Sequence, residues 1–72
     1  MNYIKVDASY VTAMRVYDGV TTPILFNICN IASVQPTRNG TPRCIVSCTD
    51  GEHYMLNETY DDFVNRTFRK NF

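Results

Sequence analysis

Residues 44–56 read CIVSCTDGEHYML, and this stretch decides the fold that we predict for the chain. Asp50 and Gly51 separate two runs that are rich in strand-forming residues, which is a strong short-range signal for a β-hairpin. The two central residues of a type I′ turn need positive φ, which glycine adopts freely and aspartate tolerates. We therefore predict two antiparallel strands that are joined by a two-residue turn at Asp50-Gly51.

The two-residue turn also predicts the register of the hairpin. It places Val46 opposite Met55 and Cys48 opposite His53 on one face, because side chains alternate between the two faces along a strand. The opposite face then carries Ile45, Ser47, Tyr54 and Leu56. Since both faces are partly apolar, we expect a helix to cover one of them and a second layer, or a second copy of the chain, to cover the other.

The segments before the hairpin predict further short strands. Apolar residues of segment 3–17 recur at helix-like spacings, but its strand-forming residues favour a strand over residues 9–17, and we predict the strand. The later segments are a turn at 18–19, an apolar strand at 24–26 opened by Pro23, a turn or single helical turn at 27–30, a strand at 31–35, and a polar loop at 37–42 with Asn39-Gly40 at its tip.

The chain ends in a predicted amphipathic helix. Thr59 followed by Asp62 fits a variant of the capping box that opens a helix. Acidic residues in the first turn and basic residues in the last turn have the favourable sense for the helix dipole. We expect the helix to dock on the sheet through an apolar stripe. The stripe consists of Tyr60, Phe63, Val64 and Phe68.

These elements predict a single α+β domain over residues 1–72 that is mostly β. The predicted architecture is an antiparallel meander of four to five short strands, followed by one C-terminal helix. A small SH3-like or Sm-like barrel is the alternative, and it would follow if residues 3–17 were helical. A chain of this length buries only roughly 60% of its extended surface, which favours assembly into a homo-oligomer.

Charge and cysteine content exclude several classes of protein. Seven basic and seven acidic residues give a formal net charge of zero, so the chain has no general attraction to nucleic acid or an anionic membrane. No apolar run approaches the roughly 20 residues that cross a bilayer, and we expect no membrane insertion. The three cysteines are an odd number without a Cys-x-x-Cys motif, so we expect reduced thiols and a cytoplasmic location.

A series of short motifs runs through the second half of the chain. Phe26-Asn27 precedes Ile-x-x-Val at 31–34, Thr-Asp-Gly-Glu follows at 49–52, and segment 58–64 opens the predicted helix. Over residues 14–68, this order resembles the small FlbD (SwrD) flagellar protein family. The chain differs in an additional N-terminal segment and a proline-bounded loop at 36–42. The resemblance implies a small cytoplasmic protein without enzymatic activity that acts through contacts with other proteins.

The predicted hairpin brings a thiol close to an imidazole. Cys48 and His53 would have Cβ atoms roughly 5 Å apart, and a thiol beside a histidine can be an activated nucleophile. The sequence supplies neither a group to orient the histidine nor an oxyanion hole, so we predict no catalytic residue. Cys44 and Cys48 stand roughly 13 Å apart along one strand and cannot share a metal ion. We therefore predict no metal and no other cofactor.

Three residues are candidates for contact with a ligand or partner. Arg38 and Arg43 flank the tip of the polar loop, and His53 lies near the predicted turn. Arginine forks suit phosphates and carboxylates, and a symmetric assembly could gather several such loops around a nucleotide or RNA. The alternative is a solvated loop that carries two ordinary surface charges.

The sequence favours a non-enzymatic, regulatory protein-interaction module that forms a homo-oligomer and binds an unidentified protein. An alternative is a phage- or plasmid-type inhibitor that binds a host protein or sequesters a nucleotide. RNA binding is a further alternative, which the zero net charge disfavours.

Overall fold

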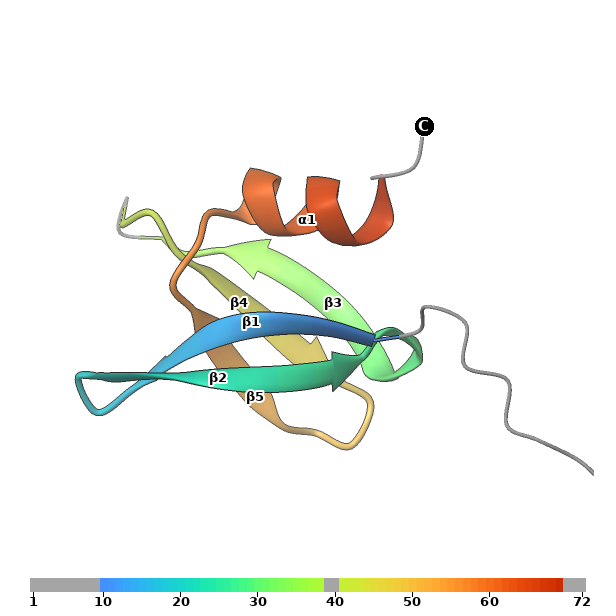
Figure 1. Ribbon diagram of the computed structural model, residues 1–72, viewed down its shortest axis with the longest axis horizontal. Coiled ribbons are helices and arrows are strands. Elements are labelled where there is room, and N and C mark those ends of the chain that lie inside the picture. Colours follow the sequence, from blue (N-terminus) through green and yellow to red (C-terminus); the bar gives the residue numbers. More distant parts are fainter. Residues whose placement is uncertain (1–9, 39–40, 70–72) are drawn as a thin grey trace, which may run out of the picture.

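The computed structural model describes residues 10–38 and 41–69, which form one five-stranded antiparallel sheet with a helix on one face (Figure 1). The elements are β1 (Tyr10–Tyr17), β2 (Val20–Asn27), the 3₁₀ turn η1 (Ile28–Asn30), β3 (Ile31–Pro36), β4 (Cys44–Cys48), β5 (His53–Leu56) and α1 (Tyr60–Phe68). The predicted α+β, mostly β class is confirmed. The strand predicted for residues 9–17 is confirmed from residue 10, and residues 3–9 lie outside the described part.

The strand order of the sheet is β2-β1-β5-β4-β3. Two ribbons, the hairpin β1–β2 and the three-stranded meander β3–β4–β5, join along β1 and β5, where Arg15 pairs with Leu56 and Val16 with Met55. The amide of Asn57 continues this contact by donating to the carbonyl of Met14 at 2.8 Å. Strands β2 and β3 form the two edges. Pro23 lies inside β2 rather than at its start, and an edge strand tolerates the amide donor that proline lacks.

The type I′ turn occurs in a different hairpin from the one in which we predicted it. Asp18 (φ 55°) and Gly19 (φ 76°) both have positive φ and link the paired residues Tyr17 and Val20, so the type I′ turn joins β1 to β2. The turn at residues 49–51 is instead a three-residue loop. Its Gly51 has φ 93° and donates its amide to the carbonyl of Cys48 at 3.0 Å. The two-residue type I′ turn predicted at Asp50-Gly51 is therefore wrong.

The extra loop residue shifts the register between β4 and β5 by one position. Val46 pairs with Tyr54 and not with Met55, and Ser47 pairs with His53 where we had predicted Cys48. A shift by one residue moves every side chain of one strand to the opposite face. Tyr54 and Leu56 therefore join Val46 on the helix side of the sheet, and His53 and Met55 lie on the other side.

The core lies between α1 and this inner face of the sheet. Its buried apolar residues are Ala13, Phe26, Cys44, Val46, Leu56 and Phe63. Phe26 is packed edge to face against Tyr54 (ring centroids 5.5 Å apart) and Phe63 (6.3 Å apart), which is a preferred arrangement of aromatic rings. The two ribbons and the helix thus share one small aromatic centre.

The helix begins as predicted, but its buried stripe is shorter than expected. Thr59 caps it by accepting a hydrogen bond from the amide of Asp62 at 3.1 Å. Phe63 is fully buried and Thr67 is 7% exposed, whereas Phe68 is 46% exposed. The predicted docking of Phe68 is incomplete: Phe68 only lines a hollow beside Ile31 and Val34 at the edge strand β3, and Thr67 is the buried residue of the last turn.

The helix therefore offers two phenylalanines in contrasting environments. We expect Phe63→Ala to lower the free energy of unfolding by about 3–5 kcal/mol, because it opens a cavity in the core. Phe68→Ala is the matched control, and we expect a change of less than about 1 kcal/mol. Urea denaturation followed by circular dichroism measures both values. Equal losses for the two variants would contradict the observed orientation of α1.

Candidate functional site

The face of the sheet opposite α1, called here the outer face, holds no buried residue among those that the structure describes. The strand registers give its members. Its apolar residues are Tyr10, Met14, Val16, Pro23, Leu25, Ile45 and Met55. Its polar residues are Thr12, Thr21, Asn27, Ser33, Gln35, Ser47 and His53. Several large apolar side chains are thus left in contact with water.

The outer face carries no formal charge apart from any charge on His53. Every Asp, Glu, Lys and Arg within residues 10–38 and 41–69 lies in a turn, in a loop, on the helix or on the inner face. Leu25 on the edge strand β2 is 63% exposed, and Met14 on the adjacent strand β1 is 42% exposed, both on this uncharged surface. The depletion of charged residues around large apolar ones is the compositional mark of an interface core.

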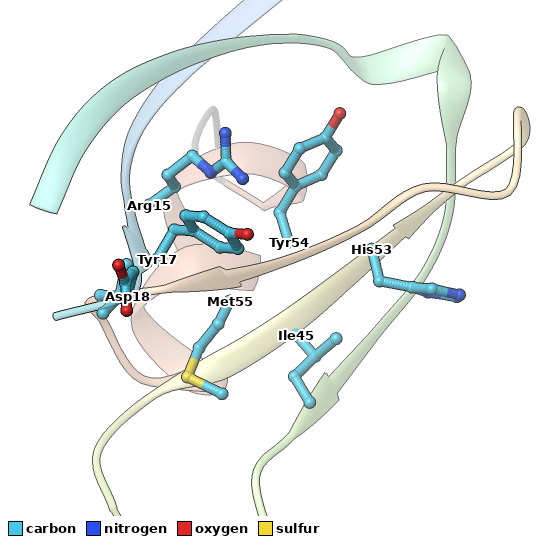
Figure 2. Close-up of a pocket in the computed structure, with 8 residues that line it drawn as sticks. Arg15, Tyr17, Asp18, Ile45, His53, Tyr54 and Met55 are labelled. Atoms are coloured by element: carbon cyan, nitrogen blue, oxygen red, sulfur yellow. The ribbon is translucent and has the colours of Figure 1, made fainter. Parts of the chain in front are cut away.

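A hollow of about 420 Å³ lies where the β1–β2 hairpin separates from β5 (Figure 2). The pairing of β1 with β5 ends at Val16 and Met55, so the end of β1 and the start of β5 diverge. The residues that line the hollow are Arg15, Val16, Tyr17, Asp18, Ile45, His53, Tyr54 and Met55. It combines apolar walls with a few polar groups, as small-molecule sites do.

Arg15 is the most unusual residue of this hollow. Its guanidinium carbon lies 5.2 Å from the ring centroid of Tyr17 and 5.1 Å from that of Tyr54, so both rings hold it by cation–π contacts. Its Nε atom is buried and has no hydrogen-bond partner in the described part of the chain. A buried donor without a partner carries an energetic cost and needs an explanation.

The structure places the three predicted contact residues apart from one another. Arg38 lines a hollow with Ile45 and Met55 at the border of the outer face, whereas Arg43 lines another hollow with Tyr60 and Asp61 beside the helix. His53 lies on the outer face and also lines the Arg15 hollow. Sequence reasoning missed Arg15, and its position two residues before a tyrosine on one strand face was the only available signal.

His53 has a serine rather than a cysteine as its neighbour. Its Nδ1 atom lies 2.8 Å from Ser47 Oγ, whereas Cys48 lies on the inner face. The cross-strand Cys48–His53 pair that we had predicted is therefore wrong. His53 has no second hydrogen-bonding partner among the described residues, so the group that orients the base in a catalytic triad is missing there. Within residues 10–38 and 41–69, no three His, Cys, Asp or Glu side chains could hold a metal ion together.

The three thiols are free and lie in different environments. Cys29 is exposed and Cys44 is buried. Burial, with a smaller contribution from the charge of Glu58, raises the pKa of the Cys44 thiol to about 11. Burial, followed by the charges of Asp50 and Glu52, also raises the pKa of Cys48. Both strand cysteines are thus held as neutral thiols and are unsuited to nucleophilic attack at neutral pH.

Comparison of the chain with family models, with curated proteins and with solved structures finds no match in any of the three. The resemblance to the FlbD (SwrD) family therefore stays a prediction. Among the described residues, no helix has the length and apolar character needed to cross a membrane.

The thiol environments predict a graded reaction with a thiol reagent such as Ellman's reagent at pH 8. We expect one thiol to react rapidly and this phase to disappear in Cys29→Ser, because Cys44 is inaccessible and Cys48 is half-buried with a raised pKa.

The buried thiol of Cys44 also predicts a pH dependence of stability. Its folded pKa lies above its ordinary value of 9.0, so the unfolded chain loses this proton first as pH rises. The free energy of unfolding should therefore fall between about pH 9 and 11. A Cys44→Ala variant that kept the whole of this fall would contradict the assignment.

Proposed function

We propose that this protein is a non-enzymatic interaction module that works as a homo-oligomer and uses the outer face as its interface. The observation that carries the proposal is the uncharged, partly apolar surface around Leu25 and Met14. Large exposed apolar patches on small soluble proteins mark sites of association. The face is a sheet surface, and two such surfaces pack well against each other in sandwiches.

A second copy of the chain fits this surface for electrostatic reasons. Two copies that meet through the outer face bring no like charges together at its centre, because that region has none. Opposite charges border the face, since Asp18 lines one hollow beside Ile45 and Met55, and Arg38 lines another. A two-fold axis in the interface can set Asp18 of one protomer near Arg38 of the other. The interface then has an apolar centre and a polar rim.

The small size of the inner core supports the same proposal. Only six apolar residues are buried among those that the structure describes, and α1 covers one side of the sheet. Burial of the outer face adds apolar area removed from water, at roughly 25 cal/mol per Å². Oligomerisation is a common way for such short chains to gain stability.

A cytoplasmic location belongs to the same proposal. Cys29, Cys44 and Cys48 are all free in the structure, as expected where thiols stay reduced. The exposed Cys29 in particular has no partner cysteine in the described part of the chain. A regulatory role through a further protein partner would use surfaces that the outer-face assembly leaves free.

The oligomer is tested by sedimentation velocity across micromolar concentrations. We expect the wild-type chain to associate and Leu25→Lys to weaken the association at least tenfold, because the lysine places a charge in an apolar interface. Leu25 is 63% exposed in the single chain, so the variant should fold normally by circular dichroism.

Val20→Lys is the matched control for this experiment. Val20 is also an exposed apolar residue of β2, at 57%, but it pairs with Tyr17 and lies on the inner side of the sheet. We expect it to associate like the wild type. A wild-type chain that stays monomeric, or equal effects of Leu25→Lys and Val20→Lys, would overturn the proposal.

A further inference from the structure

We propose that the hollow beside Arg15 binds a small oxyanion, a carboxylate or phosphate carried by a flat ring. The ring stacks against Tyr17, and the anion accepts hydrogen bonds from the Arg15 guanidinium. Arg15, Tyr17 and Tyr54 all come from one chain and lie on the inner side of the sheet, so the site needs no second chain. Val16, Ile45, His53 and Met55 of the same hollow belong to the outer face, and the oligomer proposed above would cover that part of it. The hollow, about 420 Å³, is within the size range of small-molecule sites.

The guanidinium is oriented before any ligand arrives. Contacts with the rings of Tyr17 and Tyr54, at 5.2 and 5.1 Å, fix its position. It forms no ion pair or hydrogen bond with the residues that the structure describes, although Arg66 of the same chain forms both with Glu58. Because Nε is buried, the two terminal NH₂ groups of the guanidinium are the donors left for a ligand. These two groups match the two oxygens of a carboxylate or phosphate.

The charges around the hollow limit what the anion can be. Arg15 is the only arginine or lysine among its lining residues, and Asp18 is also present. A polyphosphate or an RNA chain would be repelled by Asp18 and would find only one cation. A ligand with a single anionic group is balanced by Arg15. The charges therefore favour a small ligand over a nucleic acid.

The remaining walls indicate the shape of the ligand. Tyr17 is 68% exposed, so its ring is accessible for stacking on the side of β5 where Arg15 and Tyr54 lie (Figure 2). Ile45 and Met55 line the hollow from the other side of β5 and give that side an apolar wall. Flat rings stack on exposed tyrosines with favourable energy whatever their hydrogen-bonding groups. A ring of one or two fused cycles can therefore stack on Tyr17 while the oxyanion that it carries reaches Arg15.

The binding test is a two-dimensional ¹H–¹⁵N NMR titration of the full chain with separate ligand classes. The carboxylate arm uses benzoate and naphthoate, and the phosphate arm uses AMP and UMP. Adenosine and benzamide supply rings without an anion, and inorganic phosphate supplies an anion without a ring.

We expect at least one of the two ligand classes, carboxylate or phosphate, to give saturable shifts at residues 15–18 and 53–55. The class that responds identifies the oxyanion. Equal binding of the neutral ligands, of inorganic phosphate or of a short RNA would overturn the proposal, as would the absence of saturable shifts.

Arg15→Lys tests the role of the guanidinium with the positive charge retained. We expect roughly tenfold to hundredfold weaker binding, because lysine lacks the planar fork. Arg38→Lys is the control and should bind like the wild type, since Arg38 lines a different hollow. Leu25→Lys should bind at least as tightly as the wild type, because loss of the outer-face oligomer uncovers Ile45 and Met55 of the hollow. Unchanged affinity in a folded Arg15→Lys variant would overturn the assignment.

Discussion

The register between β4 and β5 is the constraint on which the rest of the structure depends. It is set by the loop at residues 49–51, where Gly51 occupies a positive-φ position and the amide of Cys48 donates to the carbonyl of Glu52 at 2.9 Å. Asp50 supports the loop by accepting a hydrogen bond from the amide of Glu52 at 3.0 Å. Because side chains alternate along a strand, this one loop decides that Tyr54 faces the core and Met55 faces outward.

The same register determines both candidate sites. Tyr54 on the inner side meets Phe26 and Arg15, so it belongs to the core and to the hollow at once. Met55 on the outer side continues an apolar row with Ile45 and Val16 across three strands. With the two-residue turn that the sequence suggested, Tyr54 would face outward, and Arg15 would lose one of its two rings.

The sequence contained enough information for the fold but not for the site. Local signals predicted the strands, the cap at Thr59 and the turn at Asp18-Gly19, because short-range chemistry controls these features. The register failed because Asp-Gly is compatible with two-residue and three-residue loops, and the choice between them depends on the packing of Leu56 in the core. Arg15 was missed because its contacts with Tyr54 bridge segments that lie far apart in the chain. No local pattern encodes such a contact.

Arg66 holds a part of β1 that lies away from the hollow. Its guanidinium holds Glu58 through hydrogen bonds of 2.9 and 2.7 Å and also donates to the carbonyl of Thr12 at 3.0 Å. These bonds tie α1 to β1 near the middle of that strand. The β1–β2 hairpin beyond Val16 receives no such support, since its pairing with β5 has already ended. The β1–β2 hairpin therefore separates from β5 beyond Val16, and Arg15 lies at the point of separation in contact with the rings of Tyr17 and Tyr54.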